Sequence, residues 1–371
     1  MRHLTLALLL AACGGDPGSA DGAAGDAAMT PQDASRPPRD MEPARVSDLA
    51  RTIADAGNSP MDSSATVTTD SALALLDASA AASDAPMIMS DMIVPAIAQG
   101  IYTFTLDAGA FPPTSAHPSA LVYVPTGFVA TRPLSVIVFL HGFDNCVENV
   151  VRDTGQPCTQ GMPARAAYNL IAQLEAAHKN ALLVCPEVTY DASTGAAGNL
   201  QKAGGFKALL DETLRDLPAV AGAHLTAADV GRLMVLSHSG GYEAAATIAN
   251  SGGIPVEELD LLDSLYGNFP DFDAWVKSDL PSITTTTRRF ADVYTCCGGT
   301  EANSYAMATR AEAWVDGGVE IDDRGDGGSS TWTDPVYHHG LLFKFSGLTH
   351  DGVPRYYFGE LVRNSNLPDK P

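Results

Sequence analysis

The chain is 371 residues long and strongly acidic, with 22 Lys and Arg against 44 Asp and Glu, a formal net charge of −22. Nucleic-acid binding is excluded on this ground, because neutralising phosphates requires a basic patch and no stretch of the sequence supplies one. The composition changes sharply near residue 98, which leaves about 270 residues for a folded part, enough to bury one large core.

The first 13 residues have the organisation of an export signal. Arg2 and His3 form a short polar start, and residues 4–12 form a mostly apolar run. A run this short cannot cross a bilayer as a permanent helix, so we expect a signal segment.

This segment ends in Leu10-Ala11-Ala12-Cys13, which resembles the bacterial lipobox. The resemblance implies that Cys13 is lipidated after cleavage just before it, and that the acyl chains anchor the protein in a membrane. Gly14 follows in place of an aspartate, which by resemblance to enterobacterial sorting favours the outer membrane. We therefore expect a protein of the bacterial cell envelope or outside it. An ordinary secretory signal with a chance cysteine is the alternative.

Export permits disulfides, and five cysteines remain if Cys13 carries lipid. Cys146 and Cys158 flank one loop, so we expect them to pair. Cys185 lies in an apolar run, and we expect it to be buried. The adjacent pair at 296–297 lacks the two-residue spacing of a metal-binding motif, so we expect no metal site.

Residues 14–97 are dominated by Ala, Asp, Ser, Pro, Gly and Met. Aspartates recur mostly seven residues apart, but the apolar positions of a coiled coil are not sustained, and several prolines would break such a helix. Aspartate at this spacing keeps the segment solvated. We therefore expect a disordered linker between the membrane and a folded domain at 98–371.

From residue 99 onward, short apolar runs alternate with helical stretches. Strands are expected at 101–106, 120–124, 134–140, 181–185, 233–236, 259–262, 290–294 and 341–345, and helices at 164–178, 207–217, 243–249 and 356–362. Strands separated by helix-length segments predict right-handed βαβ units. The expected fold class is α/β, with a mostly parallel central sheet flanked by helices.

The expected strand at 233–236 continues into Ser237-His238-Ser239-Gly240-Gly241. Small residues lie two positions to either side of Ser239, as a nucleophile elbow requires, because its serine sits in a strained turn. The pattern resembles the α/β-hydrolase family over roughly residues 100–365. The family elbow reads Gly-x-Ser-x-Gly, and Ser237 stands in place of its first glycine. The resemblance implies that Ser239 is a nucleophile, and a strand-to-helix loop without catalysis is the alternative.

The strand at 134–140 ends in His141-Gly142-Phe143. The hydrolase family places one amide of its oxyanion hole just after such a His-Gly pair. The resemblance therefore implies that the backbone N–H groups of Phe143 and Gly240 stabilise the oxyanion, since fixed dipoles need no reorganisation. His141 itself is expected to be structural.

The resemblance also implies a catalytic histidine late in the chain. His350 follows the last expected strand and precedes the last expected helix, where the family carries its general base. His338 and His339 lie before that strand, at its wrong end. His238 is adjacent to Ser239 on the elbow, from which its side chain is expected to point elsewhere.

The acid that would orient this histidine remains open between two residues. Asp263 directly ends the expected strand at 259–262, whereas Glu301 lies several residues beyond the next strand, which is the commoner family position. Either choice keeps the chain order serine, acid, histidine.

Together these residues imply a serine hydrolase that cleaves a small-molecule or polymeric carboxylic ester through an acyl-enzyme, without a cofactor. We expect a monomer that contacts the membrane through its lipid. The alternatives are a peptidase or lipase on the same fold, or a non-catalytic surface lipoprotein that uses the fold for binding.

Overall fold

The computed structural model describes residues 97–106, 117–188, 198–217, 225–296, 299–315 and 340–371. The expected signal segment with Cys13, residues 14–96 of the expected linker, Cys297, His338 and His339 lie outside these ranges. No helix within them is long and apolar enough to cross a membrane.

Eight strands form one sheet in the order β1-β2-β4-β3-β5-β6-β7-β8. Their bounds are β1 Gly100–Phe104, β2 Ala120–Val124, β3 Leu134–Leu140, β4 Leu182–Pro186, β5 Val230–His238, β6 Glu258–Leu262, β7 Arg289–Thr295 and β8 Leu341–Ser346. The pairs β1–β2 and β2–β4 are antiparallel, and all other neighbours are parallel. This is the mostly parallel sheet of the α/β-hydrolase fold, as the sequence predicts.

Hydrophobic patterning explains which strands lie inside the sheet. Every residue of β3 is buried, as expected for a parallel strand covered on both faces. Its side chains divide between two clusters, with Val136 and Val138 on one face and Ile137 and Phe139 on the other. By contrast β1 alternates between exposed and half-buried residues, which is the pattern of an edge strand.

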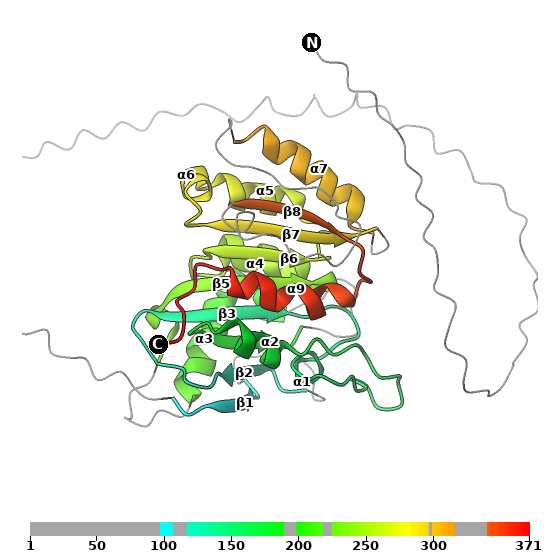
Figure 1. Ribbon diagram of the computed structural model, residues 1–371. Coiled ribbons are helices and arrows are strands. Elements are labelled where there is room, and N and C mark those ends of the chain that lie inside the picture. The colour runs from blue at the N-terminus through cyan, green and yellow to red at the C-terminus, as the bar shows by residue number, and fades with distance from the viewer. Residues whose placement is uncertain (1–96, 107–116, 189–197, 218–224, 297–298, 316–339) are drawn as a thin grey trace, which may run out of the picture. The chain divides into compact units, whose positions relative to one another are not determined.

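Helices cover both faces of the sheet (Figure 1). α2 (Leu170–Ala177) and α9 (Gly352–Arg363) pack on one face, and α3 (Gly205–Asp216), α4 (Tyr242–Ser251), α5 (Phe269–Lys277), α6 (Leu280–Thr284) and α7 (Glu301–Glu312) on the other. Leu174 of α2 and Leu361 of α9 are fully buried in the first layer, and Leu209 of α3 in the second. A shorter helix, α1 (Val147–Val150), follows β3.

One helix begins later than the sequence predicts. The expected helix at 164–178 starts only at Leu170, because backbone N–H groups of the preceding residues are used by a neighbouring loop. Tyr168 N–H donates to Val150 O and Asn169 N–H donates to Arg152 O. Asn169 also has φ of 57°, a left-handed value that prevents the helix from extending back beyond Leu170. Residues 164–169 therefore form a loop and not a helical turn.

The carboxyl ends of the parallel strands meet at one edge of the sheet. The loops after β3, β5, β6 and β8 begin there and carry Phe143, Ser239, Asp263 and His350. In open α/β sheets this edge is where ligands bind.

Candidate active site

Ser239 occupies a strained turn between β5 and α4. Its φ is 53°, a left-handed value that non-glycine residues rarely adopt, and the short turn Ser239–Gly241 leads directly into α4. A side chain at Gly142 would collide with the Cβ of Ser239, and one at Gly241 would lie 2.7 Å from the carbonyl oxygen of Leu140. Glycine at these two positions lets the end of β3 approach the serine closely.

Two further serines brace this turn. The hydroxyls of Ser237 and Ser264 lie 2.9 Å apart, and Ser264 Oγ donates to Ser239 O at 2.8 Å. Ser237, which replaces the glycine of the family elbow, is fully buried. Its hydroxyl is therefore part of a hydrogen-bonded chain that holds the backbone of Ser239. No local sequence pattern points to Ser264, which follows β6 and not β5.

His350 and Asp263 are in direct contact. His350 Nδ1 lies 2.6 Å from Asp263 Oδ2, although 87 residues separate them. Glu301, the other candidate acid, is the first residue of α7, and among the described residues the carboxylate bonded to His350 belongs to Asp263. Nδ1 is thus committed to Asp263, which leaves Nε2 for a second proton partner.

The Asp263 carboxylate is fully buried and held by several donors. Thr295 donates to it through its N–H at 3.2 Å and its hydroxyl at 2.8 Å, and the Thr300 hydroxyl donates as well. Burial alone would raise the pKa of Asp263, but the hydrogen bonds from His350 and Thr300 and the charge of His350 together lower it. Asp263 is therefore ionised at neutral pH and can stabilise a cationic imidazole. Neither threonine belongs to a sequence pattern that predicts a contact with Asp263.

Ser239 and His350 line the same pocket, which has a volume of about 270 Å³. Its other lining residues are Phe143, Asn145, Ala164, Arg165, Ala166, His238 and Asp351. Phe143 is 44% exposed, so an aromatic ring stands at the pocket rim in contact with solvent. The wall at 164–166 is the segment that was expected to be helical.

The loop after β3 is anchored so that the Phe143 amide has a defined direction. Gly142 O accepts from His141 Nδ1 at 2.9 Å and from Asn145 N–H at 3.3 Å. In a trans peptide the C=O and the next N–H point in opposite directions, so holding Gly142 O also orients the Phe143 N–H. His141 is fully buried, and its Nε2 accepts from Val188 N–H at 3.2 Å.

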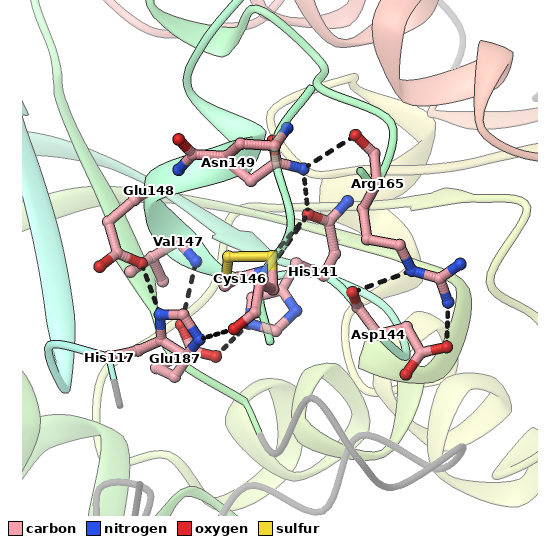
Figure 2. Close-up of a disulfide and its surroundings, with 12 residues drawn as sticks. His117, His141, Asp144, Cys146, Val147, Glu148, Asn149, Arg165 and Glu187 are labelled. Carbon is pink, nitrogen blue, oxygen red and sulfur yellow. Dashed lines mark hydrogen bonds and ion pairs between the residues drawn. A yellow bond between two sulfur atoms is a disulfide. The ribbon is translucent and has the colours of Figure 1, made fainter. Parts of the chain in front are cut away.

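Arg165 holds the same loop through two contacts with Asp144 (Figure 2). Its Nε donates to Asp144 O at 3.1 Å, and its guanidinium also pairs with the Asp144 carboxylate. Asp144 has φ of 63°, so both contacts hold a residue in a left-handed conformation. This fork binds the loop that carries Phe143 to residues 164–166.

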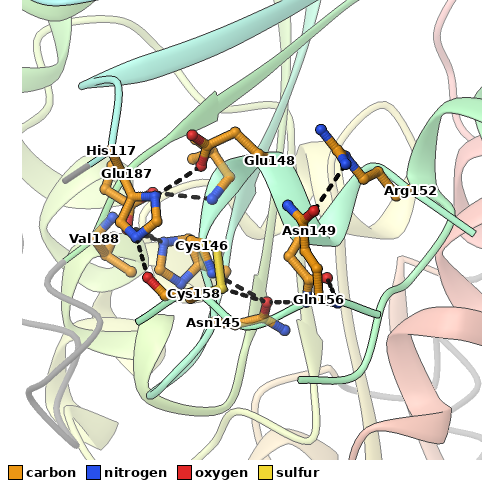
Figure 3. A network of polar contacts seen from close by, with 12 residues as sticks. His117, Asn145, Cys146, Glu148, Asn149, Arg152, Gln156, Cys158, Glu187 and Val188 are labelled. Atoms are coloured by element: carbon orange, nitrogen blue, oxygen red, sulfur yellow. Dashed lines mark hydrogen bonds and ion pairs between the residues drawn. A yellow bond between two sulfur atoms is a disulfide. The ribbon is translucent and has the colours of Figure 1, made fainter. Parts of the chain in front are cut away.

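A disulfide joins the end of this loop to the segment that precedes residues 164–166. Cys146 and Cys158 are bonded, as the sequence predicts, and Cys185 is a buried thiol. Around the bridge, Asn145 Oδ1 accepts from Asn149 Nδ2 at 2.7 Å, and His117 Nε2 lies 2.6 Å from Cys158 O (Figure 3). The loop after β3 is therefore held by covalent, ionic and hydrogen bonds.

Comparisons with known proteins give distant similarities. No protein-family model matches the sequence, and a search of curated proteins finds no match. A feruloyl esterase module from Clostridium thermocellum is similar at 12% identity and a TM-score of 0.45, over 73% of this chain and 88% of its own. An S-formylglutathione hydrolase from Agrobacterium tumefaciens is similar at 14% identity and a TM-score of 0.35, over 72% of this chain and 91% of its own.

MPT51 from Mycobacterium tuberculosis is a third similar structure, at 15% identity and a TM-score of 0.38, over 71% of this chain and 97% of its own. Similarity at this level carries no weight for activity. The α/β-hydrolase fold of this chain rests on its strand order and parallel register.

Proposed function

We propose that the protein is an exported, lipid-anchored serine hydrolase that cleaves carboxylic esters. Ser239 is its nucleophile, His350 its general base and Asp263 the acid that orients the base. One observation carries this proposal: His350 is hydrogen-bonded to a buried carboxylate and lines one pocket with a serine on a strained strand-to-helix turn. Such a combination is the arrangement of an activated nucleophile.

The mechanism follows from the hydrogen bond between His350 Nδ1 and Asp263. Because Nδ1–H donates to Asp263, Nε2 accepts the Ser239 proton as Oγ attacks the ester carbonyl. The carbonyl oxygen becomes an oxyanion held by the N–H groups of Phe143 and Gly240. His350 then gives its proton to the leaving alcohol, and an acyl-enzyme on Ser239 remains. Water, deprotonated by His350, releases the acid and restores the serine.

Labelling of the full chain with a fluorophosphonate probe tests this assignment. We expect covalent labelling of the wild-type protein and none of Ser239→Ala, because the probe reacts with an activated serine. A set of esters of increasing acyl length would then define the substrate class. A folded wild-type protein that is not labelled would contradict the hydrolase assignment.

A further inference from the structure

His238, the residue directly before the nucleophile, lies between two rings at the active site. Its side chain is only 1% exposed. The imidazole rings of His238 and His350 have their centroids 4.4 Å apart at an interplanar angle of 37°, so they lie one against the other. On its other side His238 meets the ring of Tyr168 edge-on, with centroids 5.1 Å apart. The expectation that this side chain points away from the site is not met, because it lines the pocket beside His350.

Both nitrogens of His238 have partners. Nε2 lies 3.2 Å from the carbonyl oxygen of His350, and Nδ1 lies 3.0 Å from the hydroxyl of Tyr168. A carbonyl oxygen can only accept, and a neutral imidazole has one N–H. Nε2 must therefore carry the proton, which leaves Nδ1 without a proton beside the Tyr168 hydroxyl. These contacts select one tautomer.

The neutral state of His238 follows from its surroundings. Burial, and then the positive charge that His350 can carry, lower the pKa of His238 to about 3. The Tyr168 hydroxyl donates to Asp351 Oδ1 at 3.1 Å. The hydroxyl therefore faces two acceptors, Asp351 Oδ1 and His238 Nδ1, and lies within hydrogen-bond distance of both.

We propose that His238 is a positioning residue for the general base His350. The proposal rests on the function proposed above. The hydrogen bond to Asp263 fixes the position of His350 Nδ1, but a single hydrogen bond does not by itself set the tilt of the ring plane. The His238 ring restrains the plane of the imidazole, and its Nε2–H restrains the backbone of the loop after β8.

The position of His238 in the chain explains why this matters. His238 is the last residue of β5 and Ser239 is the next residue, so a shift of the elbow moves nucleophile and support together. The same short segment thus sets the positions of both reacting groups, although His350 lies 112 residues away from His238. Misplacement of a reacting group by about 1 Å can cost about a hundredfold in rate.

Two substitutions separate the ring contact from the hydrogen bond. His238→Phe keeps a flat ring but removes the donor, and we expect kcat to fall about tenfold to a hundredfold with KM nearly unchanged. His238→Gln can place an amide N–H near the position of Nε2, so it should retain more activity than His238→Phe. Both should shift the acidic limb of the kcat/KM profile, because the surroundings of His350 change. A purely structural role would lower the melting temperature without that shift.

Tyr168→Phe provides a milder variant that removes a single oxygen atom. Without the hydroxyl, His238 loses its polar contact at Nδ1 but keeps the one at Nε2, so we expect a loss in kcat of about fivefold, the value of one hydrogen bond. His178→Asn is the matched control, because His178 is an exposed residue with φ of 58° that asparagine tolerates. Its activity should equal that of the wild type.

The decisive measurement is ester turnover and fluorophosphonate labelling of the full-length variants across pH, together with their melting temperatures. Slower labelling and a shifted pH profile of kcat/KM in folded His238 variants would support the positioning role. If the His238 variants do not fold, the same changes in Tyr168→Phe would support it. Wild-type kcat and a wild-type pH profile in folded His238 variants would overturn it. If the His238 variants do not fold, the same result in a folded Tyr168→Phe protein would overturn it. A wild-type protein that is not labelled at all would instead overturn the proposed function.

Discussion

At the scale of single residues, the site depends on a charge that burial opposes. The Asp263 carboxylate is removed from water, yet four donor groups from His350, Thr295 and Thr300 surround it. Hydrogen bonds to a charged form favour that form, and here they outweigh the cost of burial and lower the pKa of Asp263. The carboxylate can therefore hold His350 in the tautomer whose Nε2 is free to accept a proton.

Asp263→Asn is expected to lower kcat by about a thousandfold to ten-thousandfold. The amide removes the charge and can favour the tautomer with the proton on Nε2, which cannot take the serine proton. Glu301→Gln is the matched control, and we expect its turnover to stay within about twofold of the wild type. Ester turnover of both proteins, measured in parallel, decides between the two carboxylates. A larger loss in Glu301→Gln would identify Glu301 as the acid.

At the scale of elements, the loop between β3 and α1 has an unusual number of restraints. Asp144 adopts a left-handed backbone, and Arg165 holds both its carbonyl and its carboxylate. The Cys146–Cys158 bridge ties the end of this loop to the segment that precedes residues 164–166. In the proposed function this loop supplies an oxyanion donor, and such donors work through dipoles that are already oriented, so the restraints would serve catalysis as well as stability.

Arg165→Lys tests this reading of the loop. Lysine keeps the charge but cannot reproduce a planar fork, so it cannot hold the carbonyl and the carboxylate of Asp144 together. Loss of one oxyanion donor lowers kcat about a hundredfold, and a donor that is displaced but still present should lower it less. We therefore expect kcat to fall about tenfold. Arg152→Lys is the control, because Arg152 bonds to Gln156 in the same loop region and not to Asp144. Equal kcat in the two variants would show that the clamp has no catalytic role.

At the scale of the whole molecule, the chain combines a strongly acidic composition with a hydrophobic core. Two clusters of buried side chains pack on the two faces of one sheet, which explains how a chain with a net charge of −22 folds. Charge of one sign favours solubility and says nothing about fold. Attachment to a membrane is a separate property that the N-terminal residues would supply.

Cys13→Ala is expected to move the full-length protein from the membrane fraction to the soluble fraction of the producing bacterium. The substitution removes the only thiol in the lipobox-like segment, and no described helix can span a bilayer. Cys185→Ala is the control, because Cys185 is buried in β4 and its thiol is not available for acylation. Membrane association that persists in Cys13→Ala would contradict the lipid-anchor proposal.

The sequence by itself determined the fold class, all eight described strands, the turn at Ser239 and the Cys146–Cys158 pair. These features are local: an apolar run marks a buried strand, and small residues mark the end where it turns sharply. The close fit of Gly142 against Ser239 was not part of this prediction, because it depends on β3 lying beside β5 in the sheet.

Only the tertiary structure decided which carboxylate touches His350, which hydroxyls brace Asp263 and Ser239, and where His238 points. It also decided that residues 164–169 form a wall instead of a helix. Each of these depends on which strand ends are neighbours in the sheet and on contacts between residues far apart in the chain. Side-chain contacts across such separations leave no periodic pattern in a single sequence, and so they emerge only once the chain is folded.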